Sequence, residues 1–382
     1  MIIAGLMSGT SADAIDAALV RCGQGKPELL HFTSLPMPTE LREPVLRLAS
    51  PGLNEIDCMG SLDRALGKAF AQAVIECASS AGIPITDIDA IGSHGQTIRH
   101  RPRHSIGAEP FTLQIGCPAT ITEVTGITTV ANFRRRDLAA GGEGAPLVPF
   151  AHQHMFADHT QTRAVLNIGG IANMTCLSPG LPVTGFDIGP GNMVMDGLML
   201  NLSDGRHTYD KDGELAAQGI ANKDLLATLM DMPFLQQSPP KSTGREDFGQ
   251  AAVDRILAWP GLSDADRLAT ACAWTVQCIA DSRRFLTTLP DTWLVCGGGS
   301  RNTEMVQQLA KALAPATVIP TERAGFPSQT VEAISFAILA YQALTGKPNT
   351  LASVTGASHD VCGGDITPGN NWTALVKKAF LS

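Results

Sequence analysis

The sequence predicts an α/β protein, and three observations lead to this class. Apolar, strand-like segments alternate with segments of helical spacing along the 382-residue chain. Glycine-rich turns follow several of the strands, at the strand ends where α/β proteins bind their ligands. A strand, a turn of small residues and a second strand occur at 2–21 and again at 164–177, which suggests a duplicated fold.

Length and composition narrow the class of protein. A chain of 382 residues suggests two domains of ordinary size or one large domain. Apolar residues make up 44% and charged residues 17%, which is typical of a soluble globular protein. The net charge of −8 argues against a nucleic-acid binder, because such proteins neutralise phosphates with cationic side chains.

Cysteine usage and the N-terminus predict a location. The nine cysteines include no CxxC pair, and most lie in apolar stretches, which predicts buried thiols in a reducing cytosol. No basic region followed by an apolar block opens the chain, and the apolar stretch 333–344 is too short to span a bilayer. We therefore expect a cytoplasmic protein that binds neither a membrane nor nucleic acid.

The first third of the chain contains three predicted strands and a helix. Residues 2–6 and 14–21 are predicted strands joined by a turn rich in glycine and hydroxyl residues. Segment 61–82 is predicted to be an amphipathic helix that stops at Gly82. Its apolar positions recur every four residues, at Leu62, Leu66, Phe70, Val74 and Ala78. Residues 88–92 are predicted to form a strand that ends in the turn GSHGQ.

The remainder of the chain repeats this alternation. Residues 164–177 are two predicted strands interrupted by a glycine pair, and 183–199 run from a strand through a loop into a helix. In 292–313 a buried strand leads through three glycines into a helix that Asn302 or the following threonine caps. Residues 329–346 are predicted to form a helix that ends at a glycine.

The turn in "GLMSGTSADAIDAAL" (5–19) has the composition of a phosphate cradle. Consecutive small residues let backbone N–H groups approach an anion, and Thr10 and Ser11 add hydroxyl donors. Asp13 and Asp16 are candidates to hold Mg²⁺ through water, because Mg²⁺ prefers one or two carboxylates beside phosphate oxygens. A tight structural hairpin explains the same pattern. No lysine follows the glycine, so the turn is not a Walker A loop.

Two further glycine-rich turns repeat this logic. "NIGGIAN" (167–173) places a glycine pair between apolar strands, and "VCGGGSRN" (295–302) places three glycines between a strand and a helix. Such glycines permit close approach to a nucleotide, although a structural bulge also uses them. None of the turns matches GxGxxG, which disfavours a dinucleotide-binding fold.

Asp187 in "FDIGPGN" (186–192) is the candidate catalytic base. It is predicted to lie at a strand end, ahead of a rigid Gly-Pro-Gly turn, where an acid beside a phosphate cradle suits a kinase. An ordinary Asx cap of the turn is the alternative.

Basic and histidine residues lie close to the same turns. The stretches "FRRRD" (133–137) and "KSTGRED" (241–247) are candidates to recognise a carboxylate or phosphate, or are simply solvated. His94 has small neighbours that would let its imidazole reach a ligand. Three further histidines are interpreted as structural: His152, His154 and His159.

These motifs together resemble the anhydro-N-acetylmuramic acid kinase family, over nearly the whole chain. The blocks that carry the resemblance are "GLMSGTSADAID", "IGSHGQTIRHRP", "TLQIG", "FRRRDLAAGGEGAPLVP", "LNIGGIAN", "GFDIGPGN", "YDKDG", "PKSTGREDF", "VCGGGSRN" and "SVTGAS". The resemblance implies an α/β, two-lobed, actin-like ATPase (ribonuclease H-like) fold with the active site in the interdomain cleft. The first lobe would comprise 1–133 plus 351–382, and the second, with the catalytic Asp and the adenosine-binding turn, 134–350.

The resemblance also implies a set of site residues, with Asp187 as the catalytic base. The implied ATP-binding residues are Gly9, Thr10, Ser11, Ala12, Asp13, Ala14, Ile15, Asp16, Gly169, Gly170, Gly297, Gly298, Gly299 and Asn302. The implied substrate-binding residues are His94, Gln96, Arg134, Gly191, Asn192 and Glu332. The expected cofactors are ATP and Mg²⁺, the latter held through water by Asp13 and Asp16, and the expected assembly is a homodimer.

The implied reaction opens 1,6-anhydro-N-acetylmuramic acid with water and phosphorylates O6, which gives N-acetylmuramic acid 6-phosphate and ADP in cell-wall recycling. The chain departs from the family's usual motifs at Ala14, Cys117, Asn132, Glu143 and Ile188. These departures motivate an alternative, a catalytically weakened relative that acts as a sugar or nucleotide sensor. A chaperone-type or actin-like ATPase with protein partners is disfavoured by "KSTGRE" and "GSHGQT".

Overall fold

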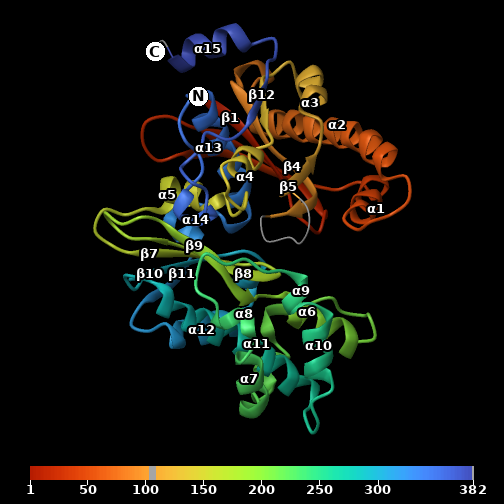
Figure 1. The fold of residues 1–382 in the computed structure, drawn as a ribbon, viewed down its shortest axis with the longest axis vertical. Helices are drawn as coiled ribbons and strands as arrows, with labels where there is room; N and C mark the ends of the chain where they lie inside the picture. Colours follow the sequence, from red (N-terminus) through yellow and green to blue (C-terminus); the bar gives the residue numbers. More distant parts are fainter. Residues whose placement is uncertain (103–108, 381–382) are drawn as a thin grey trace. The chain divides into compact units, whose positions relative to one another are not determined.

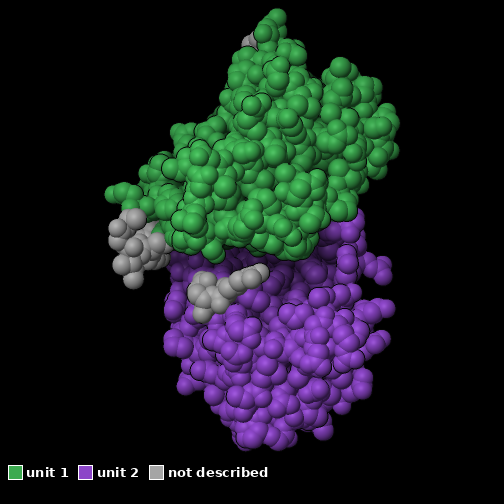
Figure 2. Space-filling model, turned by 90° about the vertical axis from the view of Figure 1, so that its right-hand side faces the viewer, with its two compact units in different colours: residues 1–155, 330–382 green, residues 156–329 purple. Residues whose placement is uncertain are grey.

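A computed structural model describes residues 1–102 and 109–380 and divides the chain into two compact units. Unit 1 comprises Met1–Met155 with Thr330–Ser382, and unit 2 comprises Phe156–Gln329 (Figure 2). Each unit has its own β-sheet with helices packed against it (Figure 1). The predicted two-lobed α/β class is confirmed.

The sheet of unit 1 has seven strands among the described residues, in the order β12-β6-β4-β1-β2-β3 with β5 on β4. β1 is antiparallel to β2 and parallel to β4, and β4 is parallel to β6. The strands are β1 (Ile2–Ser8), β2 (Ala14–Arg21), β3 (Glu28–Pro36), β4 (Ala90–Arg101), β5 (Phe111–Ile115), β6 (Thr129–Ala131) and β12 (Asp365–Thr367).

Helices cover both faces of this sheet because the side chains of β1 alternate. Ala4 and Leu6 pack in one core with the apolar face of α2, whereas Gly5 between them lies against α13 (Figure 1). The helices of this unit are α1 (Thr39–Leu48), α2 (Glu55–Ala81), α3 (Pro118–Thr125), α4 (Arg135–Ala139), α5 (Val148–Phe156), α13 (Val331–Leu344), α14 (Ala352–Thr355) and α15 (Trp372–Phe380).

The sheet of unit 2 repeats the same strand order. Its five strands within the described part of the chain follow the order β11-β10-β7-β8-β9, with β7 antiparallel to β8 and parallel to β10. β9, β8, β7, β10 and β11 thus correspond to β3, β2, β1, β4 and β6, as the duplicated fold predicts. The strands are β7 (Arg163–Ile168), β8 (Ile171–Leu177), β9 (Thr184–Pro190), β10 (Thr292–Cys296) and β11 (Thr317–Pro320).

Alternate residues of β7, β8 and β9 pack on the helices of unit 2. The side chains that share this core include Leu166, Met174 and Phe186 from the strands and Trp274 from α11. The helices are α6 (Met193–Leu202), α7 (Lys223–Met230), α8 (Pro233–Gln236), α9 (Arg245–Phe248), α10 (Gln250–Leu257), α11 (Asp264–Ser282) and α12 (Thr303–Ala312).

The contact division differs from the lobe boundaries predicted at 133/134 and 350/351. The segment directly after residue 133 and the segment directly before residue 351 were expected in the second lobe, but both pack within unit 1. Helix α13 lies on β1 and β4, and the buried Asp137 of α4 accepts a hydrogen bond from Thr355 at 2.7 Å. The chain therefore returns to unit 1 about twenty residues earlier than predicted, at Thr330.

Two predicted strand ends are wrong. β4 does not stop at residue 92 but continues to Arg101, because GSHGQ forms a bulge: Leu6 of β1 pairs with Ser93, whereas Ser8 pairs with Gln96. Gly95 in this bulge has φ +72°, and a Cβ there would lie 2.8 Å from the Ile115 carbonyl oxygen. Asp187 is likewise inside β9, because the strand stays paired with β8 up to its last residue.

The other local predictions hold. β1, β2, β7 and β8 lie where the sequence places strands, and α2 ends ahead of Gly82 at φ +65°. Asn302 caps α12 through its side-chain oxygen, which accepts from Met305 N. No disulfide joins any of the nine cysteines, all of which lie in the described part of the chain. Within 1–102 and 109–380, none of the helices combines the length and apolar character of a membrane span.

Candidate active site

The turn between β1 and β2 is tight and presents its hydroxyl groups outward. Ala12 N donates to the Gly9 carbonyl at 3.0 Å, which closes the turn around Thr10 and Ser11, both exposed. Ala12 is fully buried and has φ 51°, a left-handed conformation that is strained for alanine. The predicted ATP-binding stretch is thus a compact surface turn held by its neighbours.

Gln96 and Ser8 hold this turn from beneath. The buried Gln96 side chain donates from Nε2 to the Gly9 carbonyl at 3.0 Å. The Ser8 hydroxyl lies 2.7 Å from Gln96 Oε1 and 2.9 Å from the Ala14 carbonyl, and it can donate its proton to either. Both ends of the Gln96 amide are therefore used by the turn, and its predicted contact with a sugar stays a prediction.

The two predicted metal ligands have different surroundings. Asp13 is exposed and forms an ion pair with Arg42 at 2.9 Å. Asp16 is partly buried, and burial raises its pKa, although a hydrogen bond with Ser34 opposes this effect. Burial also raises the pKa of Glu332, with a further contribution from the nearby negative charge of Asp16. Asp16 thus shares a site with Glu332 in which a cation would relieve repulsion.

His94, Arg134 and Glu332 form the second predicted group of unit 1. Arg134 Nη2 lies 2.9 Å from His94 Nε2, and Arg134 Nη1 donates to the Gly144 carbonyl at 2.8 Å. Burial and the charge of Arg134 lower the pKa of His94 to about 3, so the imidazole is neutral and accepts at Nε2. Burial lowers the pKa of Arg134 to about 10, against the opposing charge of Glu332. This group therefore presents a cation and a carboxyl in a buried setting.

The glycine turns of unit 2 converge on one place. Gly191 N and Asn192 N donate to the carbonyls of Gly170 and Gly169, at 2.9 and 2.7 Å. The third turn meets them: Gly297 has φ +79°, and a Cβ there would overlap Asn167 Oδ1. A Cβ at either of the next two glycines would come within 3.3 Å of the Asn192 side chain, at Gly298 and Gly299. The fold thus brings together residues that the sequence singled out separately.

Asn302 lies at the edge of this group in a structural role. Its side-chain oxygen accepts from Met305 N at 2.9 Å, and its side chain is only 8% exposed. A contact of this residue with nucleotide stays a prediction.

Asp187 lies on β9, the last strand of its sheet, and has a partner that the sequence did not reveal. Thr243 N donates to Asp187 Oδ2 at 3.0 Å, and Asp187 N donates to the Lys241 carbonyl at 3.1 Å. The sequence allows "KSTGRED" to recognise a carboxylate or phosphate or simply to be solvated, but its position next to Asp187 depends on a contact across 56 residues. No local pattern signals such a contact.

Three of the five departures from the family's motifs, at Ala14, Asn132 and Ile188, are accommodated locally. Ala14 is a strand residue paired with Pro36 and is not among the residues with positive φ, which meets the condition for tolerating a side chain there. Asn132 has φ 60°, a conformation that asparagine adopts more readily than most residues, and donates to Asp365 at 2.9 Å. Ile188 is buried in the core of unit 2.

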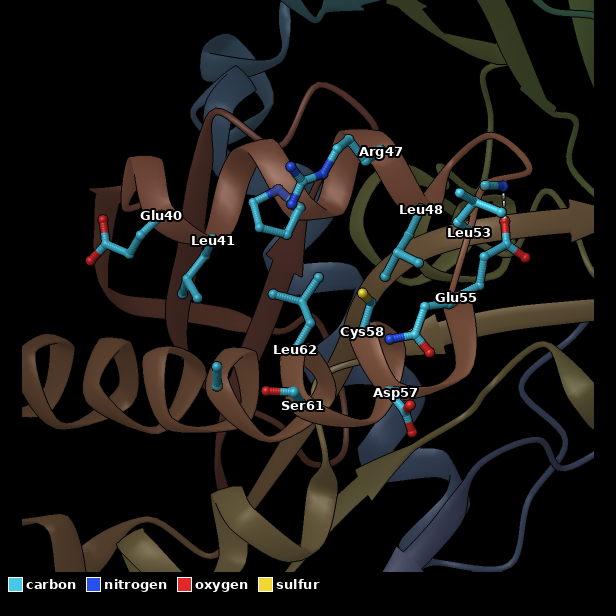
Figure 3. A pocket seen from close by; sticks show the side chains of 14 residues that line it. Glu40, Leu41, Arg47, Leu48, Leu53, Glu55, Asp57, Cys58, Ser61 and Leu62 are labelled. Carbon is cyan, nitrogen blue, oxygen red and sulfur yellow. Dashed lines mark hydrogen bonds between the residues drawn. The ribbon is translucent and has the colours of Figure 1, made fainter.

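Unit 1 also has an open cavity of about 700 Å³ between α1 and α2 (Figure 3). Leu41 and Leu48 of α1 and Leu62 of α2 point into it, and the loop that carries Leu53 borders it. None of the residues predicted to bind ATP or sugar lines this cavity.

Comparison with known proteins points to a single family. Residues 1–369 match the family model described as anhydro-N-acetylmuramic acid kinase. Proteins with that name are 42% identical over 382 residues in Caldanaerobacter subterraneus subsp. tengcongensis (96% of each chain) and 43% identical over 355 residues in Vibrio vulnificus (93% of this chain, 95% of that protein).

Similarity to solved structures is more distant. Component A of (R)-2-hydroxyglutaryl-CoA dehydratase from Acidaminococcus fermentans aligns over 88% of this chain and 96% of its own, with 12% identity and a TM-score of 0.46. A ROK family glucokinase from Streptomyces griseus, in complex with glucose and AMPPNP, aligns over 88% of this chain and 99% of its own, with 14% identity and a TM-score of 0.38.

Proposed function

The chain belongs to the anhydro-N-acetylmuramic acid kinase family, and we propose that it carries out the reaction for which the family is named. ATP and water convert 1,6-anhydro-N-acetylmuramic acid to N-acetylmuramic acid 6-phosphate and ADP. The observation that carries this proposal is the environment of Asp187, a carboxylate with one oxygen fixed by a backbone amide on the strand that leads into the glycine turns of unit 2. The retained carboxylate favours an active enzyme over a sensor.

In the proposed mechanism Asp187 acts as the general base. It takes a proton from a water molecule whose oxygen attacks C1 of the sugar. The C1–O6 bond breaks, and O6 forms a bond to the γ-phosphorus while the bond to the ADP oxygen breaks. A glycosidase needs a second carboxylic acid to protonate its leaving oxygen, whereas here the phosphoryl group takes up that oxygen's charge. One carboxylate therefore suffices.

We assign the nucleotide to the glycine turns of both units. The β1–β2 turn and the first residues of β2 (9–16) offer the exposed Thr10 and Ser11 hydroxyl groups, together with backbone amides, to phosphate oxygens. The converged turns of unit 2, Gly169–Gly170 and Gly297–Gly299, lack side chains that would block close approach.

We assign the sugar to His94, Arg134, Glu332, Gly191 and Asn192. The buried guanidinium of Arg134 suits the lactyl carboxylate, because an arginine in a low-dielectric setting binds a carboxylate strongly. The neutral imidazole of His94 orients this guanidinium through its Nε2 atom.

Magnesium fits the carboxyl groups of unit 1, most closely at Asp16. Beside a nucleotide Mg²⁺ needs only one or two carboxylates, together with water and phosphate oxygens. When bound beside ATP, the ion supplies neutralisation of phosphate charge.

We expect Asp16→Asn to raise the Mg²⁺ concentration for half-maximal turnover roughly tenfold, or about 1.4 kcal/mol. Asp13→Asn should change it less, because Asp13 already pairs with Arg42. Titration of turnover and calorimetric binding of Mg–ATP compare the two variants, and equal effects would contradict the assignment.

Gln96 offers a test of the phosphate-binding turn. Gln96→Glu keeps the shape of the side chain but replaces the Nε2 donor with an oxygen that faces the Gly9 carbonyl. The lost hydrogen bond and the new repulsion cost about 1–3 kcal/mol, so KM for ATP should rise roughly tenfold or more. Gln72→Glu, on the exposed side of α2, is the matched control. An unchanged KM for ATP would contradict the assignment of the nucleotide to this turn.

The decisive experiment supplies purified protein with ATP, Mg²⁺ and 1,6-anhydro-N-acetylmuramic acid. The proposal expects equimolar ADP and a sugar 6-phosphate, and in ¹⁸O-enriched water no label in the phosphoryl group. Sugar binding without turnover would favour the sensor. A rate of ATP hydrolysis that does not depend on the sugar would favour an ATPase with protein partners. A homodimer and a cytoplasmic location are also part of the proposal.

A further inference from the structure

The segment 241–243 runs along the outer edge of β9 at Asp187. Lys241 contributes its carbonyl to Asp187 N at 3.1 Å, and Thr243 contributes its N–H to Asp187 Oδ2 at 3.0 Å. We call this segment the 241–243 strap. It binds the backbone and the carboxylate of one residue at the same time, so rotation of that carboxylate would break a hydrogen bond.

Side chains anchor both ends of the strap. Lys241 Nζ lies over the rings of Phe234 and Phe285, at 4.5 and 5.0 Å from their centroids, and donates to the Phe234 carbonyl at 3.3 Å. Cation–π contacts stabilise a partly desolvated ammonium. At the other end Thr243 Oγ1 donates to Asp247 Oδ2 at 2.6 Å. The strap is therefore held independently of Asp187.

We propose that the 241–243 strap positions the Asp187 carboxylate for proton transfer, with Thr243 N–H holding Oδ2. This inference rests on the proposed function, in which Asp187 is the base. Thr243 and Lys241 are positioning residues because they act through Asp187. A hydrogen bond to the ionised carboxylate also favours the form that can accept a proton.

Charged groups of both signs surround the strap. Lys241 faces Asp187, and Arg284, whose guanidinium carbon lies 4.8 Å from the Phe285 centroid, faces Lys241. Burial and the charge of Arg284 lower the pKa of Lys241 to about 8, while the charges of Cys278 and Asp187 oppose that change. Lys241 and Arg284 line a small cavity, and Asp281 of α11 lines it as well.

A pair of variants at Thr243 separates the amide from the hydroxyl. Thr243→Pro removes the N–H that binds Oδ2, whereas Thr243→Val keeps it and removes only the bond to Asp247. In the full-length protein we expect Thr243→Pro to lower kcat at least tenfold with KM for both substrates within twofold of wild type. The acid limb of its kcat–pH profile should move to higher pH, because loss of a hydrogen bond to the charged form raises the pKa of a carboxyl. Thr243→Val, which removes only the anchor to Asp247, should move kcat and the acid limb in the same direction but by less than Thr243→Pro.

Variants of Lys241 test the anchor without altering the backbone. Lys241→Met should lower kcat and shift the acid limb in the same direction, and Lys241→Arg, which keeps the cation over the rings, should restore most of both. The inference is overturned if Thr243→Pro and Lys241→Met keep the wild-type kcat–pH profile, whether or not they melt at lower temperature. If they do so while Asp187→Asn is inactive, the strap fails and the base assignment stands. An active Asp187→Asn removes the base assignment itself.

Discussion

Asp187→Asn should lower kcat by about three powers of ten or more, since a positioned general base typically contributes 10²- to 10⁴-fold. Asparagine has nearly the same shape, and its carbonyl oxygen can still accept the Thr243 N–H that binds Oδ2. The variant therefore keeps the geometry of the site and loses only the ability to take a proton. Because this loss acts in the transition state, KM for ATP and for the sugar should change little.

Rapid-quench measurement of a single turnover, with both substrates saturating, reports the chemical step directly. Asp254→Asn is the matched control, because Asp254 is an exposed residue of α10 in the same unit. It should retain wild-type turnover. Activity of Asp187→Asn within tenfold of wild type would contradict the assignment of Asp187 as the base. A wild-type protein that has no turnover, but that binds the ligands as tightly as the variant does, would support a sensor.

Local patterns were sufficient to predict much of the fold. The turn between β1 and β2 and the helix that ends at Gly82 are determined by residues close together in the chain, and both lie where the sequence places them. The duplicated sheet followed from the similarity of 2–21 and 164–177, and the two strand orders agree. Gly297, in a turn that the sequence singled out, has φ +79° and lies where a Cβ would overlap Asn167 Oδ1 and the Ile168 carbonyl oxygen.

Features that depend on distant pairing could not be predicted in the same way. The bulge in β4 exists because Gln96 pairs with Ser8, 88 residues away, and a single sequence contains no signal for that register. The contact of the Gln96 amide with the Gly9 carbonyl depends on the same register. The position of Thr243 beside Asp187 is a contact of the same kind. The unit boundary at Thr330 also depends on distant contacts. The apolar pattern of α13 is that of any buried helix and does not show which unit the helix packs in.

Helix α13 lies unusually close to the sheet of unit 1, and two glycines permit this. A Cβ on Gly5 of β1 would overlap the carbonyl oxygen of Ala333, and one on Gly92 of β4 would overlap that of Phe336. The opposing atoms belong to the helix backbone, so no side-chain rotation can make room. The same helix carries Glu332 next to Ala333, which links this contact to the proposed sugar site.

We therefore expect Gly5→Ala to lower the apparent free energy of unfolding by about 3 kcal/mol, at the upper end of the usual cost of overpacking a core. Gly92→Ala should have a similar effect, for the same reason on the adjacent strand. Gly60→Ala is the control, because Gly60 lies within α2 and a Cβ there meets nothing within 4 Å. It should stabilise the protein by roughly 0.5–1 kcal/mol, the difference in helix propensity between the two residues. Urea unfolding monitored by circular dichroism measures all three variants. A Gly5→Ala protein as stable as wild type would show that α13 does not pack on β1 at this point, and the placement of Glu332 would fail with it.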